Sequence, residues 1–351
     1  MRVKLGDVCE RGTSNLKLSD VSEKNGEFSV FGASGYIGSV DFYQQGYPYV
    51  AVVKDGAGIG RAMLCPGKTS VIGTMQYLLP KDNILPKYLF YVVKYMNLEK
   101  YFTGATIPHI YFKDYKNEEF NFDFWERQVE IVSVLSKCEK VIDLCKQELQ
   151  LLDKLIKARF VELFGDPVSN SYGLPEATLP DLGEFGRGVS KHRPRNDIKL
   201  LGGKYPLIQT GDVANAGLYI TSYSSTYSEL GLKQSKMWDK GTLCITIAAN
   251  IAKTAILEFD ACFPDSVVGF IANERTNNIF VHYWFSFFQA ILESQAPESA
   301  QKNINLKILS ELKVIVPEKR KQDQFASFVK LTDKSKVAVQ KALDEAQLLF
   351  D

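Results

Sequence analysis

Residues 125–167, WERQVEIVSVLSKCEKVIDLCKQELQLLDKLIKARFVELFGDP, form the longest periodic stretch of the chain. Apolar side chains recur there in alternating steps of four and three, the heptad spacing of a helix that packs along one seam. The seam contains Ile131, Leu135, Cys138, Ile142, Cys145, Leu149, Leu152 and Ile156. Gly165 and Pro167 favour the end of a helix. The sequence therefore predicts one long helix over residues 125–165.

A second, weaker seam begins after Pro317 and continues to the end of the chain. Its members are Phe325, Phe328, Thr332, Ser335, Val339, Ala342, Ala346 and Leu349. Small residues suit packing against a bulkier stripe, so we expect the two helices to pair. In the alternative arrangement, each stripe covers only its own domain. The expected pairing residues are Ile131, Leu135, Ile142, Leu149, Leu152, Ile156, Phe328 and Val339.

The chain also repeats itself, which governs the prediction of fold. LGDVCERG (5–12) aligns with LPDLGEFGRG (179–188), and Ser70–Gly73 aligns with Ser266–Gly269. Near the end of each half, Ile110 and Gln128 fall opposite Ile304 and Gln322. Short apolar runs such as YPYVAVV (47–53) and LCITIAA (243–249) predict strands, and residues 86–102 and 279–294 predict matching helices. The predicted fold is α+β, with domains at 1–124 and 166–318 and long helices at 125–165 and 319–351.

Bulk composition excludes few function classes. The 351 residues carry 42 basic and 41 acidic side chains, so only a local basic face could mark a nucleic-acid binder. None of the six cysteines is spaced as C-x-x-C, and the chain has three histidines, which disfavours a zinc site. The start of the chain has no signal-peptide pattern and no run reaches the length of a membrane span. We therefore expect a cytoplasmic protein without a metal site.

The stretch KDGAGIGRAMLCPGKTS (54–70) comes close to a phosphate-loop pattern. A true phosphate loop leads into a helix, whereas the residues after Thr69 predict a strand, and Pro66 lacks a backbone donor. The second repeat has DACFPDSVVG in its place. The sequence therefore disfavours a nucleotide site here, and the glycines are expected to allow a tight hairpin.

A metal-dependent nuclease is a second alternative, because Asp265 and the Glu311-x-Lys313 segment resemble scattered nuclease carboxylates. The first repeat places Thr69 and Asn117 at the two acidic positions, and the spacing is long. No N-P-P-Y segment of an amino-methyltransferase is present. An ATP- or metal-dependent nuclease-type enzyme is therefore the lower-ranked hypothesis.

Polar and basic loops remain, at matching places in the two repeats. Arginine, lysine, asparagine and glutamine are the residue types that bind phosphates and base edges. Arg61 and Lys253 follow Ile59-Gly60 and Ile251-Ala252. The candidate DNA-binding residues are Lys54, Arg61, Thr106 and His109 in the first domain, and Lys191, Arg193, Arg195, Lys253, Lys302 and Asn303 in the second.

Together these features resemble the specificity subunit of type I restriction-modification systems. The repeated starts, the GATIPHIYFKD loop (104–114), the central helix and its echo KRKQDQFASFVKLTDKSKVAVQKAL (319–343) carry the resemblance. It implies two target recognition domains held apart by two antiparallel helices that form a coiled coil. It also implies a subunit without catalysis that reads a bipartite asymmetric site in double-stranded DNA. Two modification subunits and two restriction subunits would supply the chemistry of S-adenosylmethionine, ATP and Mg.

The helix geometry suits this expectation. The seam from Ile131 to Ile156 is about 39 Å long at 1.5 Å per residue. That length is close to one turn of DNA. By the offset between the repeats, Asp351 aligns with Lys157, so we expect a shortened second helix that could weaken helix pairing or partner docking. The leading alternative function is a non-catalytic structural adaptor that binds protein or glycan.

Overall fold

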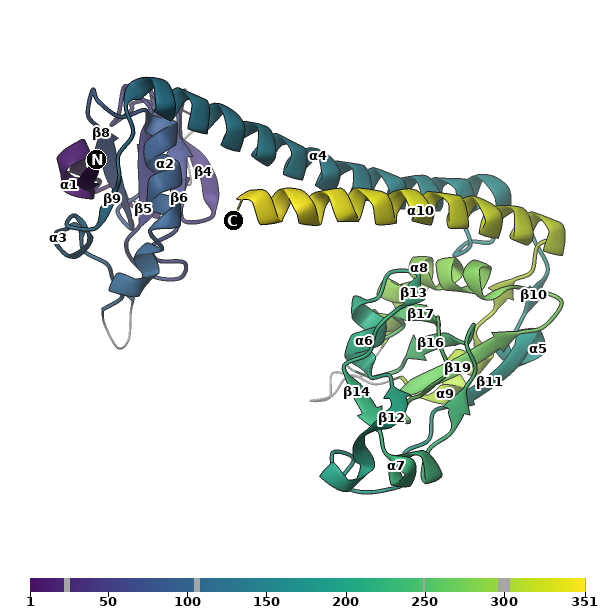
Figure 1. Ribbon diagram of the computed structural model, residues 1–351. Coiled ribbons are helices and arrows are strands. Elements are labelled where there is room, and N and C mark those ends of the chain that lie inside the picture. The colour runs from purple at the N-terminus through teal and green to yellow at the C-terminus, as the bar shows by residue number, and fades with distance from the viewer. Residues whose placement is uncertain (22–25, 104–107, 249, 296–303, 351) are drawn as a thin grey trace. The chain divides into compact units, whose positions relative to one another are not determined.

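The computed structural model describes residues 1–21, 26–103, 108–248, 250–295 and 304–350 (Figure 1). The chain divides into two compact units. Unit 1 comprises Met1–Ile142 and Gln347–Asp351, and unit 2 comprises Asp143–Ala346. The borders between the units fall inside the two long helices, α4 (Trp125–Phe164) and α10 (Lys319–Phe350).

Unit 1 is built on an antiparallel sheet with the strand order β2-β8-β5-β6. A smaller sheet has the order β4-β3-β7, and β1 pairs with β9. The strands are β1 (Arg2–Lys4), β2 (Cys9–Thr13), β3 (Phe28–Gly32), β4 (Gly35–Val40), β5 (Tyr49–Val53), β6 (Ala62–Cys65), β7 (Ser70–Val71), β8 (Met75–Pro80) and β9 (Glu119–Asn121). The helices are α1 (Leu5–Val8), α2 (Pro86–Tyr95) and α3 (Phe112–Tyr115), with 3-10 turns η1 (Leu18–Asp20) and η2 (Leu98–Tyr101).

Strand β5 shows why this stretch is a strand and where the core lies. All five of its residues are buried, because both faces of the strand are covered. Val50 and Val52 pack with Leu89 of α2, whereas Tyr49 and Ala51 belong to a separate cluster on the opposite face. Alternate side chains of a strand point to opposite faces, so a continuous apolar run suits a strand buried on both sides.

Unit 2 contains a five-stranded sheet with the order β11-β19-β16-β17-β13, a four-stranded sheet β14-β12-β18-β15 and the pair β10-β20. Its strands are β10 (Glu176–Ala177), β11 (Gly183–Arg187), β12 (Leu201–Leu207), β13 (Tyr219–Ile220), β14 (Ser225–Tyr227), β15 (Met237–Trp238), β16 (Leu243–Thr246), β17 (Thr254–Leu257), β18 (Ala261–Cys262), β19 (Val267–Ala272) and β20 (Val314–Ile315). Its helices are α5 (Leu179–Leu182), α6 (Thr210–Asn215), α7 (Glu229–Lys233), α8 (Asn278–Gln295) and α9 (Leu306–Glu311), with the 3-10 turn η3 (Ile198–Leu200).

The two units share one topology, which confirms the predicted repeat and the α+β class. The order β2-β8-β5-β6 of unit 1 corresponds to β11-β19-β16-β17 of unit 2. In both units, a short helix (α1 or α5) comes just before the first of these strands in the chain. A longer helix (α2 or α8) follows the last of them, β8 or β19. The second sheet of each unit contains one parallel pair, β3 with β7 and β12 with β18. Each unit therefore folds as one copy of the same supersecondary pattern.

One part of the predicted alignment between the repeats was wrong. Val53 and Thr246 close equivalent hairpins, and they pair with Met75 and Val267 on the neighbouring strands. Met75 thus corresponds to Val267, and the predicted match of Ser70–Gly73 with Ser266–Gly269 is four residues out of register. Both segments contain the small and β-branched residues that strands favour, so composition could not distinguish the registers.

The central helix begins at Trp125, as the sequence predicts, and ends at Phe164, one residue before the predicted end. Gly165 follows with φ +76, the left-handed conformation that ends many helices. The helix predicted over 86–102 is shorter than expected, because α2 ends at Tyr95 and a 3-10 turn occupies Leu98–Tyr101. Asn97 between them has φ +47, which an α-helix cannot continue through.

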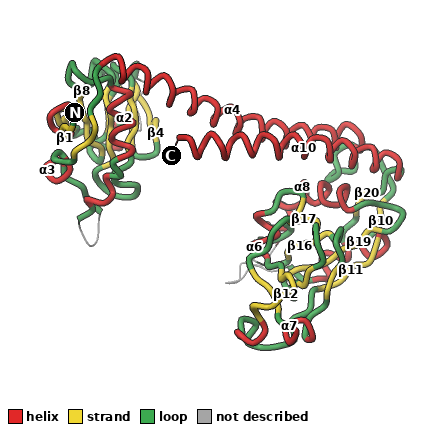
Figure 2. The backbone as a smooth tube through the Cα atoms, in the orientation of Figure 1, coloured by secondary structure: helices red, strands yellow, loops and turns green. Residues whose placement is uncertain are grey.

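Within unit 2, α4 and α10 run side by side (Figures 1 and 2). The Nζ of Lys336 lies 2.7 Å from Oδ1 of Asp153, and the ring of Phe325 packs at 5.3 Å from that of Phe160. These contacts progress in opposite directions along the two helices, so the pairing in this unit is antiparallel. The helix pairing that the sequence predicts is therefore present in unit 2.

The seam on α10 differs from the predicted one in every second position. Val329, Lys336 and Leu343 are more buried than the predicted neighbours Ser335 and Ala342, which are exposed. Phe328 packs partly against the unit 2 core, and Val339 is half-buried as predicted. Two heptad registers share Phe325, Thr332, Val339 and Ala346 and differ only in whether the step of three or of four comes first. The weak pattern could not distinguish them.

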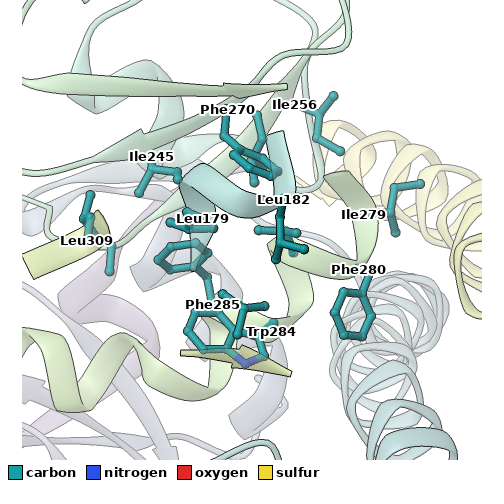
Figure 3. Packing of buried hydrophobic residues seen from close by; sticks show 14 of the residues in the cluster. Leu179, Leu182, Ile245, Ile256, Phe270, Ile279, Phe280, Trp284, Phe285 and Leu309 are labelled. Atoms are coloured by element: carbon teal, nitrogen blue, oxygen red, sulfur yellow. The ribbon is translucent and has the colours of Figure 1, made fainter. Parts of the chain in front are cut away.

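On α4, burial increases towards the end that belongs to unit 2. Ile142 and Ile156 are buried, whereas Ile131, Leu135, Leu149 and Leu152 are half-buried. The last turns of α4 enter the unit 2 core, where Phe160 and Phe164 join Phe280, Trp284 and Phe325. Figure 3 shows Phe280, Trp284 and Phe285 of α8 among the residues of this cluster. Part of the α4 stripe therefore covers its own domain, as the alternative arrangement proposed, and part pairs with α10.

Candidate nucleic-acid interface

In unit 1, the loop between β5 and β6 is held against residues 108–110. The backbone N–H of Ile110 donates to the carbonyl of Lys54 at 3.0 Å. The N–H of Gly56 donates to the carbonyl of Pro108, also at 3.0 Å. Segments far apart in the sequence therefore meet at one end of the central sheet, where predicted site residues of both loops come together.

The charged groups of this loop pair are already matched. His109 Nδ1 lies 2.5 Å from Oδ1 of Asp55, and Lys54 Nζ lies 3.8 Å from the other carboxylate oxygen. The structure thus adds Asp55 to the site, a residue that the sequence analysis did not select. The carboxylate of Asp55 holds both side chains in place and lowers the net positive charge that a phosphate would meet at Lys54.

Arg61 is an exposed cation at this end of unit 1. Its Nη1 donates to the carbonyl of Ala33 at 3.3 Å. The side chain lines an open depression of about 450 Å³ together with Ser34, Ile72 and Thr74. A guanidinium beside hydroxyl groups and backbone carbonyls is a surface that can bind phosphate or a base edge.

The matching hairpin of unit 2 has the same backbone bonds. Thr246 N–H donates to Lys253 O, and Ala252 N–H donates to Thr246 O, both at 2.9 Å. In unit 1, Val53 N–H donates to Arg61 O at 3.0 Å, and Gly60 N–H donates to Val53 O at 2.8 Å. The predicted correspondence of Arg61 and Lys253 is confirmed for the backbone.

A glycine is needed at this place in unit 1. Gly60 has φ +77, and a Cβ there would lie 2.5 Å from the backbone nitrogen of Glu99. Ala252 adopts a similar φ of +56 in unit 2 and is buried. The glycines of the former phosphate-loop candidate therefore allow a tight hairpin, as the sequence analysis expected.

The side chains of the two matched cations have different surroundings. Lys253 lines a depression of about 270 Å³ that also contains Asp153, His282 and Lys336. Burial, with a smaller contribution from Lys336, lowers the pKa of His282 from 6.5 to about 4. Lys253 therefore faces α8 and the helix pair, whereas Arg61 faces the second sheet. The matched backbone position does not give the two cations the same role.

The KHRPR loop of unit 2 forms an ion cluster around Asp265. Arg193 Nη2 lies 3.4 Å from Oδ2 of Asp265, and Arg195 pairs with the other carboxylate oxygen. Arg193 also donates to the carbonyl of Ser190 at 2.6 Å. Lys191 is exposed, and His192 lies 3.2 Å from a carboxylate oxygen of Asp197. Two arginines of the loop thus face the carboxylate of Asp265, and His192 faces that of Asp197.

Asp265 has a role that the sequence analysis did not predict, because it was grouped there with Glu311 and Lys313 as a nuclease candidate. The N–H of Ile247 donates to Ser266 O at 3.0 Å, which brings the turn at Asp265 to the hairpin end of the sheet. Across the described ranges, no three His, Cys, Asp or Glu residues gather closely enough to hold a metal ion. A carboxylate that faces two arginines is an ion-pair partner for them.

The phosphate-loop candidate leads into strands, as predicted. After Lys68 and Thr69 come β7 and β8, and the Thr69 hydroxyl donates to the carbonyl of Pro66 at 2.7 Å. No helix N-terminus follows Thr69, so the geometry that lets such loops bind phosphate is missing at this point.

Three predicted residues lie outside the described residues: Thr106, Lys302 and Asn303. The segments that contain them precede Ile110 in unit 1 and Ile304 in unit 2. Ile304 N–H donates to Ile247 O at 2.9 Å, the counterpart of the bond from Ile110 to Lys54.

Across the part of the chain that the structure describes, no helix combines the length and apolarity needed to cross a membrane.

Comparison with known proteins shows which protein family the chain matches. A family model described as the type I restriction modification DNA specificity domain matches residues 1–154 and 176–346. A protein assigned as the specificity subunit of the type I restriction enzyme MjaX of Methanocaldococcus jannaschii is 22% identical over 292 residues, 78% of this chain and 68% of that protein.

A second relative and a solved structure agree with this match. The type I restriction enzyme MjaIX specificity subunit of the same organism is 26% identical over 179 residues, 46% of this chain and 40% of that protein. The crystal structure of the type I restriction-modification system S subunit from M. genitalium superposes with a TM-score of 0.67 at 17% identity, over 100% of this chain and 94% of that one. The latter likeness supports the fold.

Proposed function

Because the chain belongs to the family of type I restriction-modification DNA specificity domains, we propose that it reads a bipartite, asymmetric site in double-stranded DNA. Each unit contacts one part of the site through the loops at the hairpin end of its central sheet. The observation that carries this proposal is that two sheets of the same strand order present different loops at this end. A shared scaffold with different loops suits two half-sites of different sequence.

In unit 1, Arg61 is the first candidate for contact, and Lys54 and His109 act together with Asp55. In unit 2, Lys191, Arg193 and Arg195 form the main cationic group. Arg193 and Arg195 must exchange Asp265 for phosphate or guanine, which favours a well-placed DNA ligand over a loosely bound one. Lys253 has the weakest support, because its side chain lies beside α8 and α10.

We further propose that the helices position two modification subunits and two restriction subunits. Those partners would supply the chemistry of S-adenosylmethionine, ATP and Mg, and this chain would supply recognition without a catalytic step. The support is the family match, which extends through residue 154 of α4 and residue 346 of α10.

The test measures DNA affinity against salt concentration for the chain with its modification subunit. Substitution of Lys191, Arg193 and Arg195 by alanine should weaken specific binding and reduce the salt slope by about one for each phosphate that is no longer neutralised. A triple alanine variant of Lys240, Arg275 and Lys313, three exposed cations of unit 2 outside both long helices, removes the same charge and is the matched control. An unchanged slope in the first variant would remove the loop from the interface. Indifference of the unmodified complex to DNA would favour the adaptor function.

A further inference from the structure

Unit 1 contains a groove of about 940 Å³ beside α2 and the first turns of α4. Its lining includes Tyr88, Tyr91 and Tyr95 of α2 and Ile131 and Leu135 of α4. Tyr95 is 87% exposed, an unusual state for a large aromatic side chain on a packed helix. The groove is separate from the hairpin end of the sheet.

The internal repeat identifies the residues of unit 2 that correspond to this lining. Helices α2 and α8 begin at Pro86 and Asn278, and the strands before them have the same offset of 192. Tyr88 and Tyr95 therefore correspond to Phe280 and Phe287. Helices α4 and α10 begin at Trp125 and Lys319, so Ile131 corresponds to Phe325.

In unit 2, these corresponding residues bind an aromatic helix end. The ring of Phe160 lies 5.3 Å from Phe280, 5.1 Å from Phe287 and 5.3 Å from Phe325. Phe164, one turn later, lies 5.1 Å from Phe280. Two aromatic residues four positions apart on one helix thus occupy the place that is a groove in unit 1.

Phe350 of α10 also lines the unit 1 groove. Its ring lies 6.1 Å from that of Tyr91, and Lys94 Nζ lies 4.2 Å from its centroid. By the offset of the long helices, Phe350 corresponds to Ile156, which is buried in the unit 2 core. In unit 2, Phe160 and Phe164 follow Ile156 on α4 and fill the place that corresponds to the unit 1 groove.

We propose that this groove is a docking site for a helix of a partner chain that carries two aromatic residues four positions apart. The pattern is that of Ala158–Phe164, ARFVELF, which fills the corresponding place in unit 2. Aromatic rings stack offset or edge-to-face against other rings, and the exposed ring of Tyr95 is free for such a contact. Tyr88 and Tyr91 are buried and form the wall of the groove, where their hydroxyl groups donate to Asp123 and Glu139. The groove is also lined by Arg2, Lys94 and Glu118, so it suits an amphipathic helix, and a helix laid into a groove is a recurring mode of recognition.

The experiment measures binding of a fluorescent peptide with the sequence of residues 157–167, KARFVELFGDP, to the full chain by polarisation. Saturable binding is expected, with at least a tenfold weaker affinity for the peptide in which both phenylalanines are alanine. Tyr95→Ala in the chain should weaken binding similarly. Tyr47→Ala is the matched control, because Tyr47 is 86% exposed in the same unit and does not line the groove. Equal binding of both peptides, or indifference to Tyr95→Ala, would overturn the proposal.

A second arm identifies the source of the helix. In this variant, the segment ARFVELFGDP is appended after Asp351. By the offset of the long helices, the segment corresponds to residues 158–167, so it extends α10 towards the groove. If the appended segment raises Tm while the free peptide does not bind, the groove accepts a covalently attached segment and the assignment to a partner chain is wrong. Binding of the free peptide that is blocked by the appended segment supports the proposal and places both in one groove.

Discussion

Gln128 and Gln322 occupy the same place in the two repeats, and their side-chain amides donate to corresponding backbone carbonyls. Both are fully buried near the first turn of a long helix. The amide of Gln128 donates to Asn83 O and Asp123 O at 3.0 and 2.9 Å, and that of Gln322 donates to Arg275 O and Pro317 O at 3.0 and 2.8 Å. Each glutamine thus ties the start of its helix to the turn before α2 or α8.

Replacing either glutamine should destabilise its unit. Gln128→Ala leaves the Leu85 N–H, which donates to Gln128 Oε1 at 2.9 Å, and two carbonyls without partners. The expected loss is about 1–3 kcal/mol in the free energy of unfolding. Urea denaturation measures it, and Gln340→Ala on the exposed face of α10 is the control. Equal midpoints for the two variants would show that the bonds contribute nothing net.

Neutralising Asp265 should strengthen DNA binding. Asp265→Asn removes the carboxylate that pairs with Arg193 and Arg195 and frees both cations for phosphate. We expect tighter binding and a steeper salt slope, with a smaller ratio of specific to non-specific affinity. Glu274→Gln, which removes one exposed negative charge elsewhere in unit 2, should change the affinity less. Weaker binding by Asp265→Asn would show that the carboxylate orients the arginines for DNA.

His282 should make unit 2 less stable as the pH falls from 6.5 to about 4. The folded pKa is about 4, so between these values the unfolded chain binds a proton that the folded chain does not. Stability therefore rises with pH across this window, by at most about 3 kcal/mol.

The first repeat supplies the variant that tests this pH dependence. His282 Nδ1 lies 2.9 Å from Thr254 Oγ1, and the residues that correspond to these two in unit 1 are Phe90 and Ala62. The double variant Thr254→Ala with His282→Phe should therefore show a shallower loss of stability in acid. Thermal melts at pH 4.5 and 7 measure the slope, and identical slopes for the two proteins would assign the effect to other groups.

ATP with Mg should not stabilise the isolated chain through residues 54–70. Lys68 has φ +57 and precedes a strand, so its surroundings lack the helix N-terminus of a phosphate loop. The expected result is the same Tm with and without nucleotide, for the unchanged chain and for Lys68→Ala. A rise in Tm that Lys68→Ala abolishes would restore the enzyme hypothesis.

The sequence alone predicted the long helices, the repeat and the matched cations. Strong periodicity predicted the first residue of α4 and its last residue to within one position, because a heptad stripe and a glycine stop are local signals. It did not fix the α10 seam, where small and polar residues satisfy two registers equally well. The strand alignment near Ser70 was wrong for the same reason, since register depends on the neighbouring strand.

Only the tertiary structure decided which side chains share a site. Arg61 and Lys253 have the same backbone place, yet one lies beside the second sheet and the other beside the long helices. Asp55 and Asp265 reach the cations through contacts between distant segments, which no local spacing encodes. The groove at Tyr95 is interpreted by comparison with unit 2, where Phe160 packs against the corresponding residue, Phe287. Local pattern fixes the elements, and the packing of elements far apart in the chain fixes the chemistry between them.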